Sequence, residues 1–92
     1  MIWKLNAMAS LKWRCWNDEW AIFDVGSGQT HQMDSLTAAT LMIVEAAPAQ
    51  LTDLILQISE DFLVPSDKNL SDVLAIILTR LEDTGLIKCE RQ

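Results

Sequence analysis

The first third of the chain alternates apolar and polar residues with a period of two, as strands do when one of their faces is buried. Residues 11–16 and 20–25 both follow this alternation, and the Asn-Asp-Glu segment at residues 17–19 favours a turn between them. The pattern therefore predicts a β-hairpin in this part of the chain.

A third antiparallel strand is expected over residues 29–33, because Gly26 and Gly28 just before it tolerate positive φ angles. Trp3 and Leu5 are compatible with a further short strand near the start of the chain. The predicted β-structure is thus concentrated in residues 1–33.

From residue 34 onward the apolar residues recur at steps of three and four, which indicates helices. A first helix is predicted over residues 35–46, with Asp34 as its N-cap and Pro48 just after its end. A second helix follows from the apolar series Leu51, Leu54, Ile55, Ile58 and Phe62.

A third helix follows a polar linker at residues 64–69, and Gly85 stands where a left-handed residue ends a helix. Its apolar series is Leu70, Val73, Leu74, Ile77, Leu78 and Leu81. One last short strand is expected over residues 86–89. These elements predict a single α+β domain over residues 1–92, with a winged-helix-like arrangement of a three-stranded antiparallel sheet followed by three helices.

Composition narrows the class of protein further. Half of the 92 residues are hydrophobic and 22% are charged, and no apolar run approaches the ~20 residues that a membrane span needs. The start of the chain lacks the features of a signal peptide, so a soluble, cytoplasmic protein with reduced thiols is expected. A disulfide between Cys15 and Cys89 is left open but has no support in the sequence.

The sequence offers little for catalysis, cofactor binding or metal binding. It has no nucleophile elbow, no glycine-rich phosphate loop and no H-E-x-x-H motif, so we expect a protein that is not an enzyme and needs no cofactor. His31 is the one histidine, which excludes an ordinary zinc site. Packing of His31 at the sheet is favoured over a role as a base for Ser27 or Cys15.

The charge balance argues against nucleic acid as a partner. The net charge is -6, and residues 34–92 hold ten acidic residues against four cations. In residues 70–84, the helix that a winged-helix protein would place in the major groove, Arg80 is the one cation among three acids. Such a surface repels phosphate, so DNA binding is the weakest of the alternatives.

Binding of a peptide or another protein fits better, because the apolar arc of the third helix is wider than one core contact requires. Val73 and Ile76 fall at one edge of that arc, with Arg80 between them in helical angle. The strand at residues 29–33 carries neither proline nor lysine, the residues that usually discourage strand addition. The candidate peptide-binding residues are therefore Gln29, Thr30, His31, Gln32, Met33, Val73, Ile76, Ile77 and Arg80.

Two alternatives to this groove stay open. The third helix could instead be buried on two sides. The binding surface could also lie over the tryptophans of the sheet, since Trp13 and Trp16 have opposite parity in one strand and cannot share a face.

The segment at residues 20–34 (WAIFDVGSGQTHQMD) and the terminal Gly85-Leu86-Ile87 resemble the PqqD-like peptide chaperones, which share the fold of the recognition elements of peptide-modifying systems. The subgroup in HPr-rel-A systems, named for a neighbouring kinase-like protein, looks closest. The similarity covers about residues 10–90, and Ser27-Gly28-x-Thr30-His31-x-Met33 is its most specific part. Gln50 departs from a frequent Ser or Thr cap in the family, and Met33 from a frequent Leu.

This resemblance implies a three-stranded sheet followed by three helices, and a leader peptide that adds as a strand to the third strand and rests against the third helix. Here these elements are residues 29–33 and 70–81. It also implies a modifying enzyme or an HPr-kinase-like protein as a partner. The alternative is a scaffolding subunit of such an enzyme with no peptide of its own, and a homodimer is left open.

Overall fold

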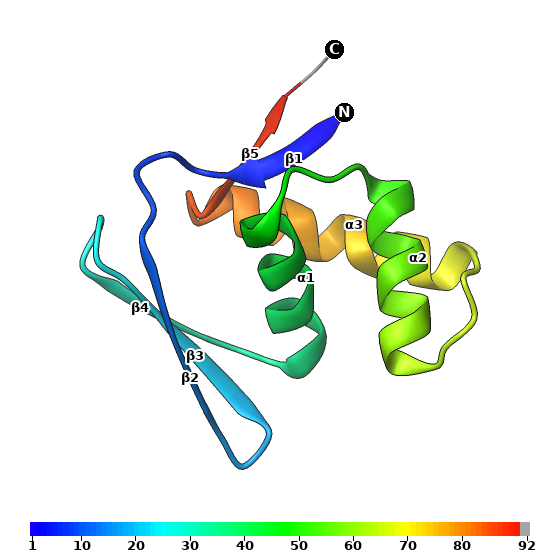
Figure 1. Cartoon of the computed structure of the whole chain (residues 1–92), viewed down its shortest axis with the longest axis horizontal. Helices are drawn as coiled ribbons and strands as arrows, with labels where there is room; N and C mark the ends of the chain where they lie inside the picture. Colours follow the sequence, from blue (N-terminus) through cyan, green and yellow to red (C-terminus); the bar gives the residue numbers. More distant parts are fainter. Residues whose placement is uncertain (91–92) are drawn as a thin grey trace.

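The computed structural model describes residues 1–90, and the predicted order of elements is confirmed in that range (Figure 1). The elements are β1 (Ile2–Leu5), β2 (Leu11–Trp16), β3 (Glu19–Asp24), β4 (Gln29–Met33), α1 (Ser35–Ala46), α2 (Leu51–Phe62), α3 (Lys68–Asp83) and β5 (Ile87–Glu90). The bounds of β2, β4 and α1 agree with those predicted from the sequence. α3 is longer than its apolar residues indicated, because a cap and polar residues extend both of its ends.

Strands β2, β3 and β4 form an antiparallel sheet in that order, which lies to one side of the helices in Figure 1. Asn17 and Asp18 connect β2 to β3 with φ angles of 50° and 60°. Positive φ at both central residues is the geometry of a type I′ turn, whose twist matches that of a two-residue hairpin. The turn predicted from the Asn-Asp-Glu segment is therefore confirmed.

The two ends of the described chain meet in a second, smaller sheet, where β1 pairs antiparallel with β5. The strand expected around Trp3 and Leu5 is therefore present, but it does not join the three-stranded sheet. Trp3 also exchanges backbone hydrogen bonds with Ala49 at 2.7 and 2.9 Å, and Lys4 forms an ion pair with Glu90. These contacts close the end of the domain opposite the β2–β3 turn (Figure 1).

Polar residues start the helices much as the sequence predicts. The Asp34 carboxylate accepts a hydrogen bond from the Thr37 N–H at 2.8 Å, so Asp34 is the N-cap of α1. At α2, the Gln50 backbone N–H donates to the Asp53 carboxylate at 3.1 Å. Gly85 follows α3 with a φ of 83°, which confirms its predicted left-handed conformation.

The hydrophobic core lies among the three helices and extends to the sheet through Ile22 of β3, which is fully buried. Its other members are Leu41, Val44, Ala49, Leu54, Ile58, Leu70, Leu74, Ile77, Leu78, Leu81, Leu86 and Ile87. Trp13 and Trp20 pack edge-to-face on the inner side of the sheet, with ring centroids 6.0 Å apart. The sheet is thus attached to the helices by its inner face, and its outer face is left exposed.

The turn before β4 is held by a buried carboxylate. Asp24 accepts hydrogen bonds from the backbone N–H groups of Ser10 and Gly26, each at 3.0 Å, and from the Ser27 hydroxyl at 2.9 Å. Chiefly the Ser10 bond lowers the pKa of Asp24. Gly28 has the expected positive φ of 77°, whereas Gly26 is needed for space, because a methyl group there would overlap the carbonyl oxygen of Met8.

Candidate groove beside the edge strand

Strand β4 is an edge of its sheet, because within residues 1–90 it pairs with β3 alone. The Val25 N–H donates to the Ser10 carbonyl at 2.8 Å, so the backbone of Val25 faces β2. Because alternate residues of a central strand bond to opposite neighbours, every second residue of β3 counted back from Val25 bonds to β2, and the residues between them bond to β4. Opposite them, His31 and Met33 turn their backbone groups toward β3. Thr30 and Gln32 therefore turn their backbone N–H and C=O groups outward.

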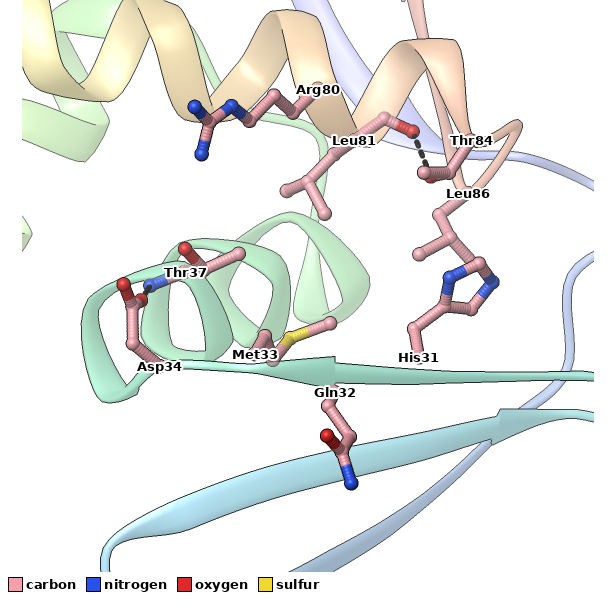
Figure 2. A pocket seen from close by; sticks show the side chains of 9 residues that line it. All are labelled: His31, Gln32, Met33, Asp34, Thr37, Arg80, Leu81, Thr84 and Leu86. Carbon is pink, nitrogen blue, oxygen red and sulfur yellow. Dashed lines mark hydrogen bonds between the residues drawn. The ribbon is translucent and has the colours of Figure 1, made fainter.

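A groove of about 300 Å³ lies between this edge and the C-terminal half of α3 (Figure 2). The residues that line it are His31, Gln32, Met33, Asp34, Thr37, Arg80, Leu81, Thr84 and Leu86. They come from β4, the first turn of α1, the end of α3 and the segment that follows it. A strand added to β4 would therefore lie along this groove.

The floor of the groove is apolar. Met33 points from β4 toward α3 in Figure 2, and the nearly fully buried Leu81 and Leu86 lie across from it. Because alternate residues of a strand face the same side, His31 and Met33 share the face that the groove covers. Side chains of an added strand would meet this apolar floor at every second position.

One positive and one negative group stand at the same end of the groove. Arg80 extends along α3 above Asp34 and Thr37, as Figure 2 shows. Hydrogen bonds from the Thr37 N–H and hydroxyl lower the pKa of Asp34, and the positive charge of Arg80 lowers it further. Across residues 1–90 the ion pair within bonding distance joins Lys4 to Glu90, so Arg80 has no carboxylate in direct contact.

His31 lies at the other end of the groove, where its ring approaches Leu86 (Figure 2). Its Nε2 atom is buried and has no hydrogen-bond partner. A buried ring nitrogen without a partner is costly, so a ligand that supplied a polar group there would gain a hydrogen bond. The expectation that this histidine packs at the sheet agrees with its position.

The predicted site residues do not all come together. His31, Gln32, Met33 and Arg80 line the groove, whereas Gln29 and Thr30 lie on β4 outside it. Val73 lines a different hollow, and the exposed Ile76 lines neither of the two.

Ile77 does not line the groove, in contrast to the prediction; it is 6% exposed and packs in the core. Its helical angle already placed it with Leu70 and Leu81 on the buried face of α3. The alternative in which α3 is buried on both sides is also wrong, since Val73 and Ile76 are 42% and 56% exposed.

Sequence reasoning missed part of the groove. Asp34 was identified as a helix cap and Leu81 as a core residue, and both have these roles while also lining the groove. Thr37, Thr84 and Leu86 carried no signal, because each lines the groove only through the way α1 and β5 pack against α3.

The outer face of the sheet is the second exposed surface with a distinct chemistry. Its hollow is lined by Lys12, Arg14, Trp16, Ala21, Ile22, Phe23 and Thr30. Trp16 and Phe23 are 47% and 42% exposed, while Trp13 faces inward and donates its indole N–H to Glu45 at 3.0 Å. The opposite parity of Trp13 and Trp16 correctly indicated this division.

Residues 1–90 contain no group of three or more His, Cys, Asp or Glu side chains placed to hold a metal ion. Nor do they contain a helix long and apolar enough to span a bilayer. Cys15 and Cys89 are both free thiols, on different sheets.

Comparisons with known proteins place the fold. No protein-family model matches the chain, and no curated protein matches it either. One solved structure, described as TbiB1 in complex with the TbiA(beta) leader peptide, superposes with a TM-score of 0.72 at 13% sequence identity. The superposition covers 97% of this chain and 99% of that one.

The chain therefore has the TbiB1 fold. The predicted fold class, an α+β domain with a three-stranded antiparallel sheet followed by three helices, is confirmed. At 13% identity the likeness concerns the fold, and function has to be argued from the site itself.

Proposed function

We propose that this protein is a non-catalytic peptide-binding domain, in which an extended peptide adds as a strand to β4 and places its side chains against α3. The observation that carries the proposal is the free edge of β4, where Thr30 and Gln32 turn their backbone groups outward beside an apolar groove. Backbone hydrogen bonds to such an edge supply affinity, and the groove selects alternate side chains.

TbiB1 supports the proposal, because a protein of the same fold was solved in complex with a leader peptide. We accordingly propose the finer assignment as well, a PqqD-like chaperone that presents a leader peptide to a modifying enzyme in the cytoplasm. Membership of the HPr-rel-A subgroup, with an HPr-kinase-like partner, stays a prediction from the sequence resemblance.

The groove suggests the chemistry of the peptide. The apolar floor of Met33, Leu81 and Leu86 favours a bulky apolar side chain that points inward. Within residues 1–90 no carboxylate contacts Arg80, which favours an acidic side chain near the end of β4, although Asp34 nearby offsets part of its charge. The proposed ligand is an extended segment that carries an apolar and an acidic residue.

A second candidate is a scaffolding subunit that binds a modifying enzyme without binding a peptide. The outer face of the sheet favours it, because Lys12 and Arg14 lie beside the exposed aromatic rings of Trp16 and Phe23. This surface is cationic in a chain whose net charge is -6, so it would suit an acidic patch on a partner. DNA binding ranks last, because the three acidic residues of α3, Asp72, Glu82 and Asp83, are exposed and would repel the phosphates.

The deciding experiment separates the two edges of the sheet. Gln32→Pro removes an N–H that points away from β3, so the sheet keeps its own hydrogen bonds while strand addition is blocked. Cys15→Pro makes the matched change on β2, whose outward residues alternate in the same way. Gln32→Ala controls for the side chain.

Binding is measured by calorimetry with short peptides encoded beside this gene and with its neighbouring gene products. We expect Gln32→Pro to weaken peptide binding by about tenfold or more, a loss comparable to one or two backbone hydrogen bonds, and the two controls to leave it unchanged. Binding that depends on Trp16 and Arg14 and ignores Gln32→Pro would instead establish the scaffolding function.

A further inference from the structure

A second hollow, of about 290 Å³, lies where the start of α1 meets the connection between α2 and α3. Its lining residues are Leu36, Phe62, Val64, Pro65, Asp67, Asn69, Leu70 and Val73. Phe62, Val64 and Val73 are each between 38% and 42% exposed, so the hollow presents apolar surface to solvent. The Asp67 carboxylate is already engaged, since it accepts the Leu70 N–H at 3.0 Å.

This hollow continues the groove beside β4 along the same helix. Val73 in the hollow and Arg80 in the groove are seven residues apart on α3, which places them on one face about 10 Å apart along the axis. On α1, the adjacent residues Leu36 and Thr37 line the hollow and the groove respectively. A peptide leaving the end of β4 would therefore reach the hollow without changing direction along α3.

We infer that this hollow binds a bulky apolar side chain of the same peptide that adds to β4, an inference that rests on the proposed function. An extended chain rises about 3.3 Å per residue and every second side chain faces the same side, so the anchoring residue lies about two or four positions beyond the one that faces Arg80. The peptide is thus held at two places, by strand pairing at β4 and by an apolar anchor at the hollow.

The charged residues around the hollow indicate the chemistry of its ligand. The exposed acids Asp61, Asp67 and Asp72 and one exposed cation, Lys68, lie within or directly beside its lining residues along the chain, so the surroundings are net negative. They favour a lysine or arginine next to the anchor and oppose a second copy of this chain, which would bring the same acids together.

The test is a selection of displayed, randomised 12-residue peptides against the wild-type protein, followed by affinity measurements on the peptides obtained. We expect peptides with an acidic residue, a bulky apolar residue about two or four positions away and a basic residue beside the latter. Val73→Asp should weaken their binding by about tenfold or more, because a charge replaces the apolar wall.

Two further variants make the result decisive. Val64 lines the same hollow from the α2–α3 connection, so Val64→Asp should weaken binding as Val73→Asp does. If one of the two variants fails to fold, the other still tests the hollow. Leu56→Asp is the control, since Leu56 is 62% exposed and lines neither the hollow nor the groove. Thermal melts of all three establish that they are folded.

The outcomes distinguish this inference from the proposed function. Peptides that are lost with Gln32→Pro but indifferent to both hollow variants would overturn the inference and leave the function standing. A selection that gives no binder would overturn both. Sedimentation that showed a dimer abolished by Val73→Asp would assign the hollow to a second copy and overturn the inference as well.

Discussion

Two neighbouring isoleucines on α3 have the same side chain but very different surroundings. Ile76 is 56% exposed and Ile77 is 6% exposed, although the two side chains are identical. A helix turns by about 100° per residue, so one step carries the side chain from the surface into the core.

The two faces of α3 therefore have separate tasks. The buried face carries Leu70, Leu74, Ile77, Leu78 and Leu81 and holds the helices together. The exposed face carries Val73, Ile76 and Arg80, of which two are apolar without being covered. The core accounts for the first face, and the second is available to the peptide proposed above.

The largest expected effect separates these isoleucines. Ile77→Asp places a charge in the core without a partner and should reduce the free energy of unfolding by about 3–5 kcal/mol. Ile76→Asp should change it by no more than about 0.5 kcal/mol, because water still solvates the new carboxylate. Urea unfolding of both variants is the measurement, and similar losses in both would show that α3 has no exposed face.

A smaller loss is expected when a buried side chain is shortened without adding charge. Leu74→Ala leaves a cavity beside the other helices and should cost about 2–5 kcal/mol. Leu78→Ala tests the same effect one turn further along α3. Val73→Ala is the matched control on the exposed face and should lie within about 0.5 kcal/mol of the wild type. A Val73→Ala loss as large as that of Leu74→Ala would place Val73 in the core.

The sequence predicted the buried face of α3 well, because apolar spacing reports which side of a helix is covered. It also predicted the bounds of α1 and β4, where Asp34 and Gly28 mark a cap and a turn. Ile77 was placed in the groove even though its spacing matched the core. The apolar spacing shows that the arc of α3 is wide, but it does not show at which residue the core contact ends and the exposed surface begins.

The groove itself was harder to predict, because its walls come from segments far apart in the chain. Thr84 caps the end of α3, and Leu86 lies in the segment that leads from α3 into β5. The hollow at Val73 depends on how the α2–α3 connection packs, and Phe62, which belongs to the apolar series that predicted α2, is 38% exposed. Periodicity describes single elements, whereas these surfaces are products of packing.

The pKa of Asp34 is lowered chiefly by hydrogen bonds from Thr37, and further by the positive charge of Arg80 on the exposed face of α3. The pKa of Asp34 lies below its ordinary value of 3.8, so its ionised form stabilises the folded state. This contribution is complete above the unfolded pKa and is lost as the pH falls through the folded pKa.

Asp34→Asn keeps a good N-cap but cannot ionise, whereas Asp34→Ala removes the cap and should cost about 0.5–2 kcal/mol at pH 7. Urea unfolding between pH 2 and 7 should show the advantage of wild type over Asp34→Asn disappearing below about pH 4. Asp24 titrates in the same window but is common to both proteins, so its contribution cancels. A difference that stayed constant with pH would contradict an ionised Asp34 cap.

The smallest effect concerns Arg80. Arg80→Gln should leave the free energy of unfolding within about 0.5 kcal/mol, because the side chain is exposed and has no carboxylate in contact within residues 1–90. Binding of a selected peptide with an acidic residue should weaken by about two- to fivefold, which is the range of an exposed ion pair.

A double-mutant cycle isolates that pair. The peptide is measured with its acidic residue and with the corresponding amide, each against wild type, Arg80→Lys and Arg80→Gln, at low and high salt. If Arg80 contacts the acid, Arg80→Gln weakens the acidic peptide but not the amide, Arg80→Lys retains part of the affinity, and salt removes the difference. Equal losses for both peptides would mean that Arg80 contributes through its aliphatic stem, and the exposed face of α3 would then recognise apolar surface alone.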